Sequence, residues 1–286
     1  MAAGSSDGPS ASLRRSLPLG LALLIAFSPV LIDLGRHIVA TPWARGALVF
    51  PWLVFLAARA DRPDRPPASG RRWVALALGA ALVFQLLAIG GDAIRIARVG
   101  VAAAVAIGLW GSGLAGPRTA LLALWLLPVP SFAVEALSPG LETAKGRLAA
   151  LWPGLGMSDP VGLSAPALVT GQGAIALTPL EGGVVLAAGL AGLLWARALL
   201  RGGSLGRCSA GAVIGAVMAI PLQIVVLVAL GQGVSSGWLP LDLARPMLDL
   251  AGPLLVVAGG LGLTLLRPVH GGRTERPAAR RRSVPC

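Results

Sequence analysis

Residues 209–230 read SAGAVIGAVMAIPLQIVVLVAL, an uncharged segment that is long enough to cross a lipid bilayer as a helix. Apolar segments of similar length recur along the chain, separated by short segments that contain nearly all the arginines. Of the 286 residues, 55% are hydrophobic and 13% are charged, and the mean hydropathy is +0.79. A soluble core cannot bury so much apolar surface. We therefore predict an all-α, polytopic transmembrane helix bundle.

The positions of the arginines predict how the bundle is oriented. Arg14 and Arg15 precede the first apolar segment, and further arginines cluster at 59–72, at 197–207 and after 266. Roughly 17 of the 24 lysine and arginine residues then fall on one side, as the positive-inside rule requires. We expect about eight spans, with both termini in the cytoplasm. The net charge of +12 is explained in this way, so no nucleic-acid partner is expected.

The expected organisation is a polar tail at 1–16, a membrane domain at 17–266 and a basic cytoplasmic tail at 267–286. Within the membrane domain, spans are expected at residues 17–35, 47–58, 73–91, 99–116, 119–134, 182–200, 209–230 and 248–266. Pro128 and Pro130 should end the fifth span, because proline removes a backbone donor and clashes with the preceding turn. The segment 137–179 is expected to be an extracytoplasmic loop region.

Two elements are expected within this loop region. Residues 141–151 place apolar side chains at helical spacing and Glu142, Lys145 and Arg147 elsewhere, which predicts an amphipathic helix lying on the bilayer surface. Residues 167–176 alternate loosely and contain two glycines, which favours a short β-hairpin.

Several stretches resemble the exosortase and archaeosortase family of polytopic membrane cysteine transpeptidases. They are Phe55-Leu-Ala-Ala-Arg59, Leu126-Leu-Pro-Val-Pro130, Gly171-Gln-Gly-Ala-Ile-Ala-Leu177 and Ala219-Ile-Pro-Leu222, together with the amphipathic segment. The resemblance covers residues 20–266. It implies cleavage, and in some members transfer, of the C-terminal sorting tails of exported proteins. The implied nucleophile is a cysteine at the outer end of one helix. Its implied partners are an arginine, and a histidine or arginine, at the outer ends of the next two.

The sequence departs from the family at the positions that would carry catalysis. The family's cysteine should fall near the outer start of the sixth span, but 181–192 contain none, and 223–231 lack the arginine of its Asn-x-x-Arg motif. Three residues stay as candidates: Cys208 at the cytoplasmic end, Arg245 at the family's third position and Glu181 at the outer boundary. Each has a plainer interpretation, as an interfacial cysteine or as a charged residue in water at a helix end.

Some polar residues have structural interpretations only. Gln223 and Gln85 lie inside spans and should face the bundle interior, where their amides find partners. Asp33 and Arg36 lie one helical turn apart, which predicts a local ion pair. The two histidines and two cysteines are isolated, so we expect neither a metal nor a cofactor.

Three functional hypotheses follow. The first is an exosortase-like pseudoenzyme with an accessory role in protein export or envelope processing. The second is an active membrane thiol transpeptidase or protease that uses Cys208, or Glu181 with Arg245. The third is a small transporter or an accessory subunit of a membrane complex. The arginine-rich composition suggests a bacterium, so we expect the inner membrane, with the lipid bilayer and sorting tails or other membrane subunits as partners.

Overall fold

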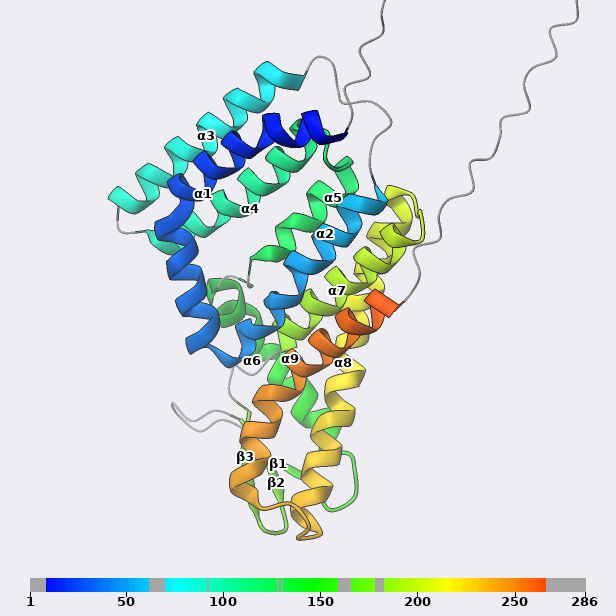
Figure 1. Cartoon of the computed structure of the whole chain (residues 1–286). Helices are drawn as coiled ribbons and strands as arrows, with labels where there is room; N and C mark the ends of the chain where they lie inside the picture. Colours follow the sequence, from blue (N-terminus) through cyan, green and yellow to red (C-terminus); the bar gives the residue numbers. More distant parts are fainter. Residues whose placement is uncertain are drawn as a thin grey trace, which may run out of the picture.

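A computed structural model describes residues 9–61, 70–91, 93–127, 129, 131–158, 166–177 and 183–265 of the chain. The fold is mainly helical (Figure 1). Its helices are α1 (Pro9–Ala40), η1 (Pro42–Val49), α2 (Phe50–Ala60), α3 (Gly70–Gly90), α4 (Ile94–Gly111), α5 (Pro117–Leu122), η2 (Ala123–Leu126), α6 (Ser131–Ala149), α7 (Gly183–Leu200), α8 (Leu205–Ser235) and α9 (Leu241–Leu265).

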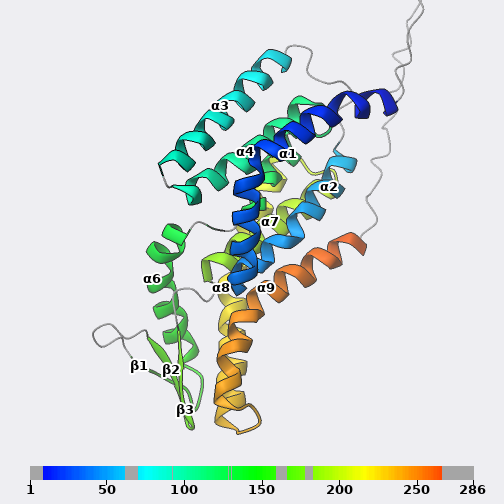
Figure 2. The same ribbon diagram turned by 60° about the vertical axis from the view of Figure 1, so that its left-hand side comes forward.

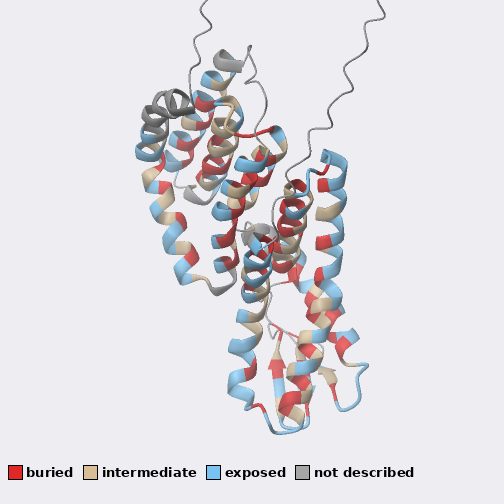
Figure 3. Cartoon of the chain, turned by 45° about the vertical axis from the view of Figure 1, so that its right-hand side comes forward, coloured by how far each residue is buried: buried red, intermediate tan, exposed pale blue. Residues whose placement is uncertain are grey.

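Four of the helices in these residues are long and apolar enough to cross a membrane. Their apolar windows are Trp73–Gly90, Gly183–Leu200, Leu205–Ser235 and Leu241–Leu263. Figure 3 shows exposed residues along the outer helices, and many of these are large hydrophobic side chains, such as Leu87 and Val217. Such surfaces suit lipid rather than water. The chain is therefore a membrane protein, as its composition predicts.

The helices form two packed groups (Figure 1). Helices α1, α3 and α4 lie together and bury a cluster that includes Phe27 and Val101. Helices α2, α5, α7, α8 and α9 form the second group, whose core includes Phe50, Leu186 and Trp195. Asp33 joins α1 to α4, because the Nε atom of Arg98 donates to its Oδ2 atom at 2.8 Å. The expected pair of Asp33 with Arg36 is therefore wrong: a partner on another helix takes the carboxylate.

Helices α7 and α8 pack closely because glycine is present at their contact. A Cβ atom on Gly215 of α8 would lie 2.4 Å from the carbonyl oxygen of Leu190. Small residues of this kind let the backbones of two membrane helices approach each other. This contact aligns α7 with α8 along much of their length (Figure 1).

A three-stranded antiparallel sheet lies at one end of the molecule (Figure 2). Its strands are β1 (Gly156–Ser158), β2 (Ala167–Thr170) and β3 (Gly173–Ala176), in the order β1-β2-β3. The hairpin predicted at 167–176 is confirmed: Gly173, at φ +154°, follows a two-residue turn. Strand β1 was not expected. We call the described residues of 131–177, which are α6 and this sheet, the cap.

The cap packs against the end of α8 and the start of α9 (Figures 1 and 2). Its own core includes Leu168 and Ile175 from the sheet, and Leu227 and Val234 from α8. Helix η2 ends at Leu126, just before Pro128, as the prolines predict. The span expected at 119–134 is not one helix, however, because α6 starts anew at Ser131.

Candidate functional site

Helix α6 buries three of its polar side chains. Ser138, Glu142 and Lys145 are 0%, 3% and 2% exposed, whereas Leu148 of the same helix is 49% exposed. The expectation of a surface helix with Glu142 and Lys145 directed away from its buried face is therefore wrong. Charged groups can be buried in this way when they neutralise each other, and here they do.

Lys145, Glu142 and Gln223 form a buried polar cluster between α6 and α8. The Nζ atom of Lys145 donates to the Oε1 atom of Glu142 at 2.7 Å and to the Oε1 atom of Gln223 at 2.6 Å. Gln223 is 9% exposed. Its expected burial in the bundle interior with a polar partner is confirmed. Two oxygens of different helices thus converge on one ammonium group.

The first residue of α7 completes the cluster. The backbone N–H of Gly183 donates to the Glu142 carboxylate, and a Cβ atom on Gly183 would lie 3.1 Å from both Glu142 Oε1 and Lys145 Nζ. Glycine thus leaves room for the ion pair at the start of α7. Burial raises the pKa of the Glu142 carboxyl above its ordinary value, while Lys145 and the Gly183 N–H act against this rise.

A pocket that is partly open to solvent adjoins the ion pair. Besides the three polar side chains, its walls are apolar residues from α7, α8 and α9: Leu186, Val226, Leu227, Leu248, Ala251, Gly252 and Leu255. A few converging polar groups in an apolar cavity are typical of small-ligand sites. This cavity is therefore the candidate functional site.

The site lies near one edge of the lipid-facing zone. The large apolar side chains that α8 exposes run from Leu205 to Val225, a rise of about 30 Å, which equals the hydrocarbon thickness of a bilayer. Gln223 lies in the last turn of this zone, and the remaining turns of α8 pack against the cap. The cluster therefore lies where the membrane helices meet the cap.

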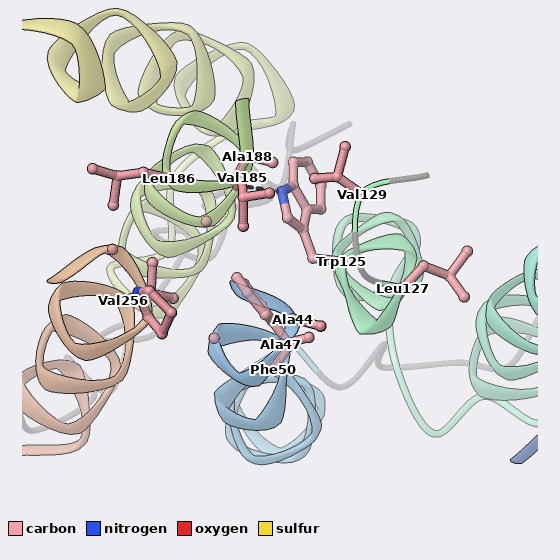
Figure 4. A pocket seen from close by; sticks show the side chains of 14 residues that line it. Ala44, Ala47, Phe50, Trp125, Leu127, Val129, Val185, Leu186, Ala188 and Val256 are labelled. Carbon is pink, nitrogen blue, oxygen red and sulfur yellow. Dashed lines mark hydrogen bonds between the residues drawn. The ribbon is translucent and has the colours of Figure 1, made fainter. Parts of the chain in front are cut away.

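A second pocket, also partly open to solvent, lies among η1, α2, η2, α7 and α9 (Figure 4). Phe50, Trp125 and Val256 contribute to its apolar lining. The one indole donor in this lining is satisfied, because Trp125 Nε1 donates to the Ala188 carbonyl at 2.8 Å. The cavity therefore offers shape and apolar surface, and no titratable group.

A second charged cluster lies at the opposite end of α8. Asp61 accepts from the Arg118 guanidinium and, at 3.1 Å, from the Thr119 hydroxyl. Arg118 also donates to the carbonyl oxygen of Gly203 at 2.6 Å. These bonds join the end of α2, the start of α5 and the loop between α7 and α8. The donors and acceptors of this cluster satisfy one another, which indicates a structural role. We call Asp61, Arg118, Thr119 and the Gly203 carbonyl the Asp61–Arg118 joint.

Cys208 belongs to this joint. It is fully buried, and its sulfur lies 4.0 Å from the Gly203 carbonyl oxygen. Arg245 lies in α9, beyond the far end of α8, and is exposed. From Cys208 to the end of α8 the helix rises about 40 Å, so the two residues cannot share a site. Glu181, the third candidate, lies outside the described residues.

Lys145 was expected among the external cations, and its place in the buried cluster was not predicted. One feature of the sequence nevertheless pointed to it. Lys145 is the only lysine in the chain, and the other 23 of the 24 basic residues are arginines. Glu142 precedes it by three residues, the spacing of a helical ion pair. A unique residue type with a helical partner could have identified the cluster.

Compared with known proteins, the chain matches no family model, no curated protein and no solved structure.

Proposed function

We propose that this chain is a non-catalytic, exosortase-like protein of the bacterial inner membrane, with an accessory role in protein export or envelope processing. In this proposal it has about eight spans and both termini in the cytoplasm. The cap would face the outside and contact exported proteins that carry C-terminal sorting tails.

The position of Cys208 is the observation that carries the proposal. A thiol transpeptidase needs a reachable thiolate beside a cationic partner and the substrate. Cys208 has no exposed surface, and it lies in the Asp61–Arg118 joint, at the end of α8 away from the cap. Arg245 and the sheet lie at the other end. The geometry thus supports binding at the cap rather than thiol chemistry.

The exposed surface of the cap supports a binding role. Leu151 and Trp152, which follow α6, are 80% and 56% exposed, and Trp238 near the end of α8 is 70% exposed. The Nε2 atom of Gln232 donates to the carbonyl oxygen of Pro153 at 2.7 Å and so holds the two tryptophan-bearing segments together. Tryptophan is enriched in binding surfaces and at membrane interfaces.

The proposal can be tested by replacing the cysteines in the native host. A deletion strain would be complemented with the wild-type chain or with the variant C208A/C286S, at matched protein levels in the membrane. The readout is the amount of exported proteins that keep their C-terminal tails, measured by mass spectrometry of the cell envelope. We expect deletion to change this amount and both chains to restore it equally.

Two results would contradict the proposal. If the cysteine-free chain is present in the membrane but fails to restore processing, the chain is a thiol enzyme. If deletion leaves all tail-bearing proteins unchanged, the export role is wrong.

A second candidate function, transport by the chain or by a complex that contains it, is favoured by one observation. The buried Glu142–Lys145 pair lies where the cap meets the membrane helices, and ionisable groups inside membrane proteins often mark ion pathways.

A further inference from the structure

The oxygens around Lys145 form a place for a single positive charge. One carboxylate oxygen and one amide oxygen lie 2.7 and 2.6 Å from Nζ, which are the distances of short, charge-assisted hydrogen bonds. The carboxylate is held in position by Lys145 itself and by the backbone N–H of Gly183. The ammonium is carried on a flexible side chain, whereas the oxygens come from two packed helices.

Charge balance restricts what could replace this ammonium. The buried pair is neutral, and an uncompensated charge in such a place is strongly unfavourable. A bound anion could displace Glu142 only if the carboxylate took up a proton. A bound cation could displace Lys145 only if the amine released one. Either exchange leaves the site neutral.

The presence of lysine rather than arginine at position 145 favours the second exchange, in which a cation displaces the ammonium group. The chain uses arginine at every other basic position, and arginine binds anions well but does not give up its proton in proteins. Lysine is a compact charge that can lose its proton when buried. Arginine, the usual basic residue of this chain, would suit a site that binds an anion.

We propose that Glu142 and Gln223 form a binding site for one monovalent cation, either a small inorganic ion or a primary ammonium, which the Lys145 side chain occupies in this structure. Binding of the cation releases one proton from Lys145, so that one positive charge enters as another leaves. The adjoining cavity receives the neutral amine, because Val226, Leu227 and Leu255 give it an apolar surface.

Among the residues that the structure describes, the pocket lining contains no charged side chain besides Glu142 and Lys145. Helix α7 contributes the Gly183 N–H and Leu186, and helix α8 contributes Gln223 and apolar residues. Helix α9 lines the cavity with apolar residues alone, while its charged residues Asp242, Arg245 and Asp249 lie off the lining. On α6, Arg147 is exposed. The exchange therefore concerns Glu142 and Lys145.

The full-length chain in detergent micelles allows a direct test, because its single lysine gives a single resonance when lysine is labelled with ¹³C at Cε. The resonance would be followed as a function of pH in sodium, potassium, methylammonium or choline chloride at equal ionic strength. We expect one of the three small cations to lower the midpoint pH by about one unit for each tenfold increase in concentration. Choline, which carries no N–H donor and is bulky, should leave it unchanged.

Two variants test whether the cation dependence of the Lys145 midpoint arises at this site. The variant Arg147→Gln, altered at an exposed position of the same helix, should respond like the wild type, and Glu142→Gln should lose the cation dependence. Equal midpoints in all four chloride salts would overturn the proposal, and this measurement needs only the wild type. The titration would be repeated with sodium acetate in place of sodium chloride, and a midpoint that changes with the anion would assign the ammonium to an anion instead. A response that persists in Glu142→Gln would place the site elsewhere.

This inference does not depend on the export role, because cation binding is measured on the isolated chain. Its failure would leave the cysteine-replacement experiment unaffected, and the reverse also holds.

Discussion

The Nζ atom of Lys145 lies 2.6 Å from the Oε1 atom of Gln223, a contact that joins α6 to α8 across 78 residues of sequence. Because α6 belongs to the cap and Gln223 lies in the last lipid-facing turn of α8, this contact fixes the cap to the membrane helices. The same Nζ atom also donates to Glu142, which is the charged partner of Lys145.

Removing one member of the buried pair should destabilise the chain more than removing both. Lys145→Met or Glu142→Gln alone leaves a buried polar group without its charged partner, and we expect each to lower the free energy of unfolding by about 3–5 kcal/mol. The double variant E142L/K145M should lose less than either single variant. Reversible unfolding in mixed micelles, followed by tryptophan fluorescence, measures this. Arg147→Met serves as the exposed control, and additive losses in the double variant would contradict the coupling.

Cys208 should resist alkylation in the folded chain. In a C286S background, a membrane-permeant maleimide should leave Cys208 unmodified until the chain is unfolded, because the residue is fully buried. The variant Gly206→Cys, at an exposed position in the first turn of the same helix, should react at once. Mass spectrometry after timed labelling gives both rates. With an impermeant reagent on intact cells, reaction of Gly206→Cys would overturn the proposed cytoplasmic location of this end.

Gly215 should tolerate no larger residue. In Gly215→Ala, the new methyl group would lie 2.4 Å from the Leu190 carbonyl oxygen, so α7 and α8 must separate, and we expect a loss of about 1–3 kcal/mol. Gly206→Ala is the matched control, since nothing lies within 4 Å of its Cβ position on the same helix. It should be neutral or stabilise α8, because alanine favours a helix more than glycine does. Equal thermal midpoints for both variants would contradict the close packing of these helices.

Replacing Asp61 should destabilise the chain more than replacing Arg59, the charged residue two positions earlier. Asp61→Ala removes the acceptor of both Arg118 and Thr119 in a mostly buried position, with an expected loss of about 2–3 kcal/mol. Arg59 is exposed and lies 4.3 Å above the Phe55 ring, so Arg59→Ala should cost about 0.5 kcal/mol. Thermal unfolding of the two variants in the same detergent compares them. A larger loss for Arg59→Ala would show that the joint is not formed.

Local sequence signals predicted most of the helices. The uncharged run at 209–230 lies within α8, and the segments at 73–91 and 182–200 match α3 and α7 to within three residues at each end. Their apolar length alone dictates a membrane helix, so no tertiary information was needed. The hairpin at 167–176 was also predictable, because Gly173 supplies a conformation that other residues rarely adopt.

The burial of the charged side chains of α6 could not be predicted from hydropathy. A helix that carries glutamate and lysine is expected to turn them toward water, and only the presence of Gln223 and Gly183 in the folded chain makes burial of Glu142 and Lys145 favourable. For the same reason the ion pair of Asp33 was assigned to Arg36, its neighbour in sequence, rather than to Arg98 on another helix. Both errors concern partners that are distant along the chain.

Helix α8 makes polar contacts at two separate levels: at its start, around Gly203 and Cys208, and beyond its middle, at the amide of Gln223 some four turns after Cys208. Each residue of a helix is rotated by about 100° from the one before it. A rotation of α8 about its axis by even half that angle would carry Gln223 away from Lys145 and shift Cys208 within its packing. The two sets of contacts therefore fix the rotation of α8 about its own axis.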